Sequence, residues 1–169
     1  TIGTSAAGGT SSHSYTVVIG TGAFRAAATS DADGTVAIGV DAAMSITSGI
    51  ANVAIGYQAL DAEDDGDWNT AVGYQALTAQ TGTSGAVYNT AIGSQAGAAI
   101  TTGTYSTIIG AQAGKAITTG AENTVVGTQA LYANIVGTQN TTVGSIAGYN
   151  IIGSYTTAIG SQAARFASG

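Results

Sequence analysis

A repeat unit that contains Ile-Gly or Val-Gly recurs nine times in 169 residues, most often seventeen residues after the previous copy. The repeat glycines are Gly20, Gly39, Gly56, Gly73, Gly93, Gly110, Gly127, Gly144 and Gly160. So short a unit cannot bury its own apolar face, so each copy is expected to be one coil of a solenoid. The repeat runs from end to end, and we therefore expect residues 1–169 to form a single repeat domain.

The residues around the repeat glycines predict strands. The residue before each glycine is always Ile or Val, and β-branched side chains favour strands. A second segment, at residues 100–103 and 117–120, predicts another strand after the first turn of the coil. We therefore expect an all-β fold, a parallel β-roll or solenoid of about nine 17-residue coils with two strands each.

The predicted strand is apolar on both faces. The column two residues before the glycine is apolar and mostly small, as at Ala91 and Ile108. Neighbouring strand residues point to opposite faces, so one apolar column fills the coil and the other lies on its surface. Burial against identical chains would remove such an exposed stripe. We expect a homo-oligomer, with the column of Ala91 and Ile108 at the interface.

Two amide columns and the glycines themselves are expected to be structural. An invariant glycine marks a backbone with positive φ or a close approach of another backbone. Stacked amides can hydrogen-bond from coil to coil, and direct ligand binding is the alternative. Gln recurs two residues after the glycine at Gln58, Gln75, Gln95, Gln112, Gln129 and Gln162. Asn recurs four residues before it at Asn52, Asn69, Asn89, Asn123 and Asn140.

Composition excludes several classes of function. Only 7% of the residues are charged, the net charge is −6, and the basic residues are Arg25, Lys115 and Arg165. Nucleic-acid binding requires clustered Lys and Arg, so we expect no nucleic-acid partner. No apolar run approaches the roughly 20 residues of a membrane span, so we expect no membrane insertion. The chain lacks Cys and does not begin with Met, and we expect it to be a segment of a longer polypeptide.

The repeat resembles those of known fibrous proteins. Residues 69–77 read Asn-Thr-Ala-Val-Gly-Tyr-Gln-Ala-Leu, and residues 106–110 read Ser-Thr-Ile-Ile-Gly. These forms resemble the repeats of trimeric autotransporter adhesin heads, such as that of the Yersinia adhesin, and of phage tail-fibre proteins. The resemblance implies a left-handed, homotrimeric β-roll that is a segment of a longer fibre or adhesin.

The same resemblance implies two alternative functions. One is a structural and receptor-binding segment of a phage tail fibre that attaches to the host. The other is a bacterial adhesin head that mediates cell adhesion. The location would be the virion or the extracellular bacterial surface, and the partner a host surface glycan or an outer-membrane receptor.

We expect neither catalysis nor a cofactor. His13 is the single histidine, lies in a Ser-rich stretch, and is expected in a surface loop, so no base is placed to activate a serine. Five of the nine acids lie in residues 61–67, where Asp61, Glu63 and Asp65 match the start of a calcium loop. Val72 stands where the bidentate Glu should be, so these three are weak metal candidates and a solvated acidic loop is the preferred interpretation.

Aromatic residues are the candidates for receptor contact. Trp68, Tyr88 and Tyr105 precede the strand, and Tyr57 and Tyr74 follow the glycine. Aromatic rings beside amides suit sugar recognition, and packing over turns or across subunits is the alternative. Contacts are expected where the repeat is broken, at residues 24–33, 61–68 and 80–87, because loops on a rigid scaffold carry recognition.

Ice binding is a third and less favoured function. It rests on the threonine column three residues before the glycine, and the neighbouring Ala or Ile column argues against it. The column comprises Thr70, Thr90, Thr107, Thr124, Thr141 and Thr157.

Overall fold

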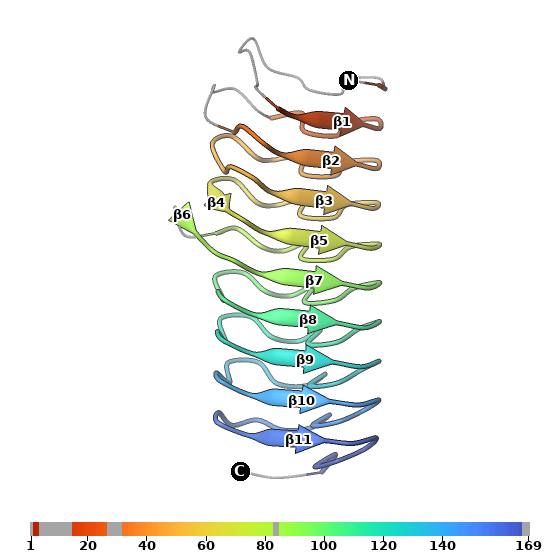
Figure 1. Cartoon of the computed structure of the whole chain (residues 1–169), viewed down its shortest axis with the longest axis vertical. Coiled ribbons are helices and arrows are strands. Elements are labelled where there is room, and N and C mark those ends of the chain that lie inside the picture. The colour runs from red at the N-terminus through yellow and green to blue at the C-terminus, as the bar shows by residue number, and fades with distance from the viewer. Residues whose placement is uncertain (1, 4–14, 27–31, 83–84, 167–169) are drawn as a thin grey trace.

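The computed structural model describes residues 2–3, 15–26, 32–82 and 85–166. In this part of the chain there is no helix, and nine three-residue strands form one parallel sheet that runs the length of the molecule (Figure 1). The strands are β1 (Val17–Ile19), β2 (Val36–Ile38), β3 (Val53–Ile55), β5 (Thr70–Val72), β7 (Thr90–Ile92), β8 (Thr107–Ile109), β9 (Thr124–Val126), β10 (Thr141–Val143) and β11 (Thr157–Ile159). Each coil contributes one strand, so the predicted all-β parallel solenoid is confirmed.

The register is constant along the sheet. Each strand residue pairs with the residue in the same repeat column of the next coil, as Val72 does with Ile92 across a 20-residue spacing. The same columns pair across the 17-residue spacing between β7 and β8. The additional residues of the longer spacing therefore form an insertion outside the sheet.

The predicted second strand is wrong for most coils. Residues 100–103 and 117–120 form bends within irregular backbone, and among the described residues only the short strands β4 (Gly66–Asp67) and β6 (Gly85–Ala86) pair on that side. Hydrogen bonds still join these segments from coil to coil, as from Thr101 N to Thr118 O at 2.9 Å. Bends at Thr101 and Thr102, and at Thr118 and Thr119 in the next coil, interrupt the extended backbone before a ladder can develop.

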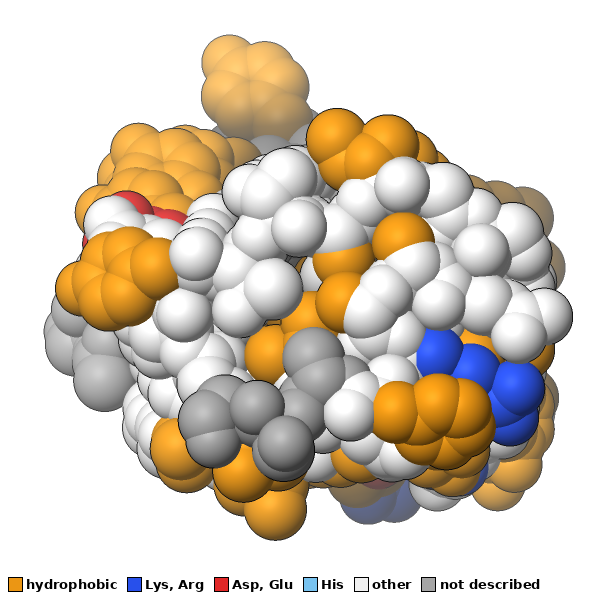
Figure 2. Space-filling view, turned by 90° about the horizontal axis from the view of Figure 1, so that it is seen from below, with side chains coloured by type: hydrophobic (Ala, Val, Ile, Leu, Met, Phe, Trp, Pro, Cys, Tyr) orange, Lys and Arg blue, Asp and Glu red, His pale blue; other side chains and the backbone are white. Residues whose placement is uncertain are grey.

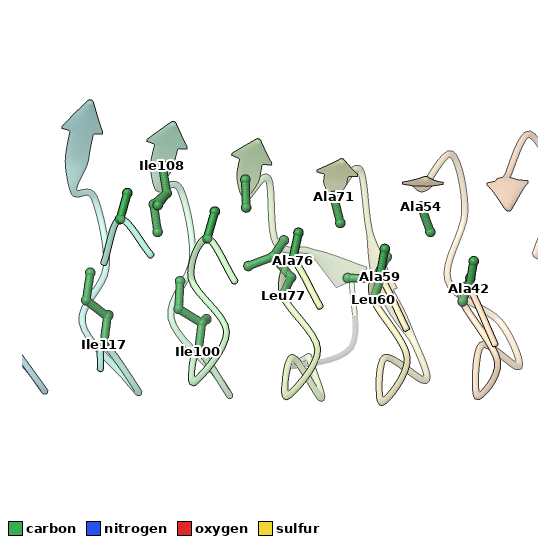
Figure 3. Packing of buried hydrophobic residues seen from close by; sticks show 14 of the residues in the cluster. Ala42, Ala54, Ala59, Leu60, Ala71, Ala76, Leu77, Ile100, Ile108 and Ile117 are labelled. Carbon is green, nitrogen blue, oxygen red and sulfur yellow. The ribbon is translucent and has the colours of Figure 1, made fainter. Parts of the chain in front are cut away.

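The core is a single file of side chains inside the coils (Figure 3). Strand residues enter from one side and turn residues from the other. In two coils their volumes compensate, because Ala71 is followed in its own coil by Leu77, whereas Ile108 is followed by Gly114. Where both positions are small, at Ala91 and Gly97, the neighbouring coils fill the space: a Cβ on Gly97 would lie 3.1 Å from Leu77 Cδ2 and 3.2 Å from Ile108 Cδ1.

The orientation of the strand corrects one prediction. Ala91 and Ile108 are fully buried inside the coil, so their column is not at a subunit interface. The column beside the glycine points outward instead, with Ile92 39% and Ile109 36% exposed. Leu and Ile side chains from the turns already fill most of the narrow interior. The strand column that points inward is therefore the one with the smaller side chains. The apolar character of both faces is confirmed.

The glycine column satisfies both predicted requirements. Gly110 has φ +131°, and a Cβ on it would lie 2.6 Å from the carbonyl carbon and oxygen of Gly127 in the next coil. Non-glycine residues also adopt left-handed backbone at the corners, including Leu77 (φ 49°), Tyr88 (φ 54°) and Gln95 (φ 57°). Such a conformation costs roughly 1–2 kcal/mol per residue, so interactions between coils must offset it.

Candidate functional site

The outer face of the nine-stranded sheet is a regular surface that runs along the molecule. We define it as the strand residues one and three positions before each repeat glycine, which point away from the core. In β7, β8 and β9 these residues are Thr followed by Ile or Val, and they are half-buried or exposed. In β1 to β3 the first of them is Val. The face is therefore an apolar stripe with a threonine column along its C-terminal part.

The glutamine column forms a hydrogen-bonded ladder, as predicted. From Gln75 to Gln129, the Nε2 of each glutamine donates to the Oε1 of the glutamine one coil earlier, whereas Gln162 is outside the ladder because Ile146 stands in the column one coil before it. The distances are 3.0 Å for Gln75 to Gln58, 3.3 Å for Gln95 to Gln75, 3.1 Å for Gln112 to Gln95 and 3.0 Å for Gln129 to Gln112. These partly buried amides satisfy one another, so the column supports the turn next to the strand.

The asparagine column is buried and structural. Asn123 Oδ1 accepts a hydrogen bond from Asn140 N at 3.0 Å, which ties the coil to its neighbour. Its Nδ2 donates to Gly137 O at 2.9 Å, which ties the start of the strand to the glycine turn across the coil. Asn52 and Asn89 make the same cross-coil bond, to Gly66 O and Gly103 O. The column braces each coil from within, and its amides are not presented to a ligand.

The five predicted aromatic residues form two stacks, one at each end of the strands. Trp68 and Tyr88 lie before β5 and β7, with ring centroids 4.9 Å apart and planes at 8°, and Tyr105 continues the stack at 5.4 Å from Tyr88. Tyr57 and Tyr74 follow the glycines after β3 and β5, with centroids 5.5 Å apart. All five are 40–55% exposed. Stacking covers both faces of Tyr88 and one face of each other ring, so the stacks offer a partner their edges, their hydroxyls and the outer faces of the end rings.

The weak metal candidates do not come together. No group of three acidic or histidine side chains able to hold a metal ion occurs among the described residues, and this includes Asp61, Glu63 and Asp65. Other acids of the segment bond to the neighbouring coil, as Asp67 Oδ1 does in accepting from Ile50 N at 2.8 Å. The segment belongs to the turn structure of two coils.

Glu63 departs most from the expected solvated loop. Its side chain is fully buried, and its Oε1 accepts from Asp64 N at 3.0 Å and Gly66 N at 2.8 Å. Its Oε2 is buried without a hydrogen-bond partner in the described structure. Desolvation raises the pKa of Glu63, and the two backbone N–H groups only partly oppose it. Burial likewise raises the pKa of Asp61, with the Asp41 charge adding to the effect.

A column comparison would have predicted the burial of Glu63. It stands seven residues after its glycine, in the column that also contains Ile46, Gln80, Ile100, Ile117, Asn134 and Ile151. Sequence reasoning treated it as part of an acidic cluster and missed the column. It also missed Tyr132 and Tyr149, five residues after their glycines, whose rings stack at 4.9 Å with planes at 2°.

Some predicted contact segments are only partly described. His13 lies outside the described residues, as do 27–31 of the N-terminal break and 83–84 of the insertion. Phe24, at the start of the first segment, is fully buried in the core and cannot contact a receptor. No cavity opens in the described surface, so a ligand would bind on an exposed face.

Comparison with known proteins adds no family to the fold described above. No helix in the described residues is long and apolar enough to cross a membrane. No protein-family model, no curated protein and no solved structure matches the chain.

Proposed function

We propose that this chain is a structural and receptor-binding segment of a trimeric fibre, of the kind found in phage tail fibres that attach to a host. The observation that carries the proposal is the outer face, an apolar stripe that continues through nine coils. At about 4.8 Å per coil it is roughly 38 Å long. A stripe of this length on a monomer is a large exposed apolar patch, which identical chains bury when they associate side by side.

In this proposal the outer faces of three chains meet around a common axis. The column of Ile92 and Ile109 supplies the apolar contact, and the threonine column lies beside it. Receptor contacts come from what breaks the repeat, with Trp68, Tyr88 and Tyr105 on one side of the strands and Tyr57 and Tyr74 on the other. The location is the virion. In the alternative, the same trimer is a bacterial adhesin head on the cell surface.

Ice binding is favoured by one specific observation. The threonine column and the Ile or Val column share the outer face in constant register, as in Thr107 and Ile109 beside Thr124 and Val126. Such an array can serve ice only if it stays exposed to water. The trimer requires the outer face to be buried between chains, whereas ice binding requires the same face to be exposed to water.

Light scattering and sedimentation of the isolated chain test the proposal. We expect three chains in wild type and a shift to monomer in Ile109→Lys, because a lysine cannot be buried unpaired in an apolar interface. Thr119→Lys is the matched control, because Thr119 is exposed on the turn side of the same coil, and it should leave the trimer intact.

A well-folded wild-type monomer would overturn the trimer, and thermal hysteresis in that monomer would establish ice binding. Loss of the trimer in Thr119→Lys as well as in Ile109→Lys would remove the outer face from the interface. Trp68→Ala should keep the trimer and weaken attachment to host cells; unchanged attachment would make the segment a passive spacer.

A further inference from the structure

All three basic residues of the chain stand in one repeat column. Arg25, Lys115 and Arg165 each lie five residues after a repeat glycine, although the column has nine members and the protein carries a net charge of −6. In the last four coils the column reads Lys115, Tyr132, Tyr149 and Arg165. We call these four residues the basic–aromatic strip. They lie on the return segment of the coil and do not belong to the outer face.

Direct contacts order the strip. The rings of Tyr132 and Tyr149 are parallel, with centroids 4.9 Å apart. Lys115 Nζ lies over the ring of Tyr132 at 5.9 Å from its centroid. Arg165 Nη1 donates to Gln162 Oε1 at 3.3 Å, and Arg165 Cζ lies 4.9 Å from the centroid of Phe166. A ligand would therefore meet groups that already hold their positions.

In the described part of the chain, the two cations are held by rings and an amide and not by carboxylates, so their charge is available to a partner. They stand three coils apart, which is roughly 14 Å at the spacing of parallel strands. Seen from the C-terminal end in Figure 2, Lys and Arg side chains gather beside hydrophobic ones on one side of the molecule. Five of the nine acids lie in residues 61–67, three coils before Lys115 and six before Arg165, on the side of Lys115 away from the rest of the strip.

We propose that the basic–aromatic strip binds a carboxylate-bearing saccharide chain that lies along the solenoid axis. The cations at its ends neutralise carboxylates, and the two phenols between them supply hydroxyls and ring edges. Both faces of Tyr132 are covered, by Lys115 and by Tyr149, so a sugar ring contacts the edge of Tyr132 and either the edge or the outer face of Tyr149. A ladder with one step per coil matches a polymer whose groups recur at regular intervals.

Other anionic partners fit less well. A nucleic acid presents a phosphate about every 1.7 Å of duplex axis and needs many cations, whereas the strip has two on an acidic protein. An acidic peptide gains affinity from side-chain pockets or from pairing with a sheet edge, and the described surface has no cavity beside the strip. The proposal is independent of the trimer and of receptor contact at Trp68.

Calorimetric titration with a galacturonic acid pentamer tests the proposal, with cellopentaose as the uncharged control. We expect the wild type to bind the acidic pentamer, more weakly as salt is added, and to bind cellopentaose much less. Lys115→Gln and Arg165→Gln should each weaken binding about two- to fivefold, as expected for exposed charge pairs. The double variant should weaken binding by the product of the two single effects, about four- to twenty-fivefold, because the two sites lie far apart and act independently. The variant with both Tyr132→Phe and Tyr149→Phe keeps the stack but should also weaken binding.

Arg25→Gln is the matched control, because Arg25 stands in the same column without the tyrosine stack. It should leave binding unchanged, and every variant should keep the wild-type melting temperature. Equal weakening by Arg25→Gln and Lys115→Gln would reduce the effect to net charge and overturn the site. Binding of a glutamate pentapeptide as tight as that of the galacturonic acid pentamer would overturn the saccharide assignment. No binding of the pentamer by wild type would overturn the proposal and leave the trimer and Trp68 tests unaffected.

Discussion

In the coils that contain Ile100 and Ile117, the buried column seven residues after the glycine is apolar. In the two coils before them the same column holds Glu63 and Gln80. Gln80 is accommodated because its Nε2 donates to Thr101 O at 3.1 Å and its Oε1 accepts from Asn89 Nδ2 at 2.8 Å. Glu63 keeps one oxygen without a partner among the described residues. We refer to residues 90–123 as the regular coils and to residues 53–89 as the polar-core coils.

The comparison shows that backbone register and core composition are separable. The strands pair identically in both regions, through the same three columns. What changes is the side chain that reaches the axis, and with it the shape of the adjacent turn, since β4 and β6 occur only beside the polar-core coils in the described structure. A single coil can therefore take an insertion and a polar core while its neighbours stay regular.

Gly110→Val in the regular coils should have the largest effect. A valine has no accessible conformation at φ +131°, and its side chain would clash with Gly127 of the next coil. We expect a loss of more than about 4 kcal/mol or failure to fold, measured by circular dichroism and denaturant unfolding. Gly153→Ala is the control, because no atom lies within 4 Å of the position that its Cβ would take, and it should be nearly silent. Similar unfolding of both variants would refute the close-approach explanation.

Ile117→Ala should be next in size. Ile117 is fully buried, and removing its side chain leaves a cavity that the rigid coil cannot close, at a cost of about 2–5 kcal/mol. Gln80→Ala in the polar-core coils removes two hydrogen bonds and leaves Asn89 Nδ2 with its bond to Gly103 O. We expect Gln80→Ala to lower the free energy of unfolding by less than Ile117→Ala does. If denaturant unfolding showed that Gln80→Ala loses more free energy of unfolding than Ile117→Ala, the buried polar side chain would stabilise its coil more than the buried apolar one does.

Trp68→Ala should have a smaller effect on stability. It removes the stack with Tyr88, which bridges the insertion between β5 and β7, and aromatic pairs contribute about 0.5–1.5 kcal/mol. Tyr105→Ala, at the other end of the same stack, should cost a similar amount. A much greater loss of melting temperature from Trp68→Ala would mean that the tryptophan holds the insertion in place.

Glu63→Gln should give the smallest change, and one that depends on pH. Because burial raises the pKa of Glu63 above 4.5, the folded protein binds its proton more tightly than the unfolded chain does. Stability contributed by this group is thus present below pH 4.5 and is lost as pH rises through the higher folded pKa. The variant should melt higher than wild type at pH 7, and the difference should shrink as pH falls towards 4.5. A difference in melting temperature that does not change with pH would show that folding does not raise the pKa of Glu63.

The periodic part of this structure could be predicted from sequence, and the reasons are local. Fixed columns of Ile or Val, Gly, Gln and Asn predict a strand, a turn with positive φ and amide ladders. The side of the strand that faces inward could not be predicted, because Ala91 and Ile92 are both apolar and the decision depends on how much space the turns leave. The second strand was wrong because the backbone bends at Thr101 and Thr102, just before Gly103, instead of staying extended.

The candidate sites depended on features that a search for local clusters overlooks. Asp61, Glu63 and Asp65 are close in sequence, yet they stand in different repeat columns and therefore lie in different parts of the coil. Lys115 and Arg165 are fifty residues apart and share one column. In a solenoid, neighbours in space are found by adding a whole period.

The constant register has a consequence for how the length of such a protein can change. Each coil bonds only to the coils before and after it, and the same donors and acceptors recur at every junction. Removing residues 107–123 would join Ser106 to Thr124, which is the step from the Asn or Ser column to the threonine column found elsewhere in the chain. A duplication or deletion of whole repeats in the gene therefore alters the rod by about 4.8 Å per copy without requiring a new fold at the seam. The number of repeats in the gene therefore sets the length of the rod.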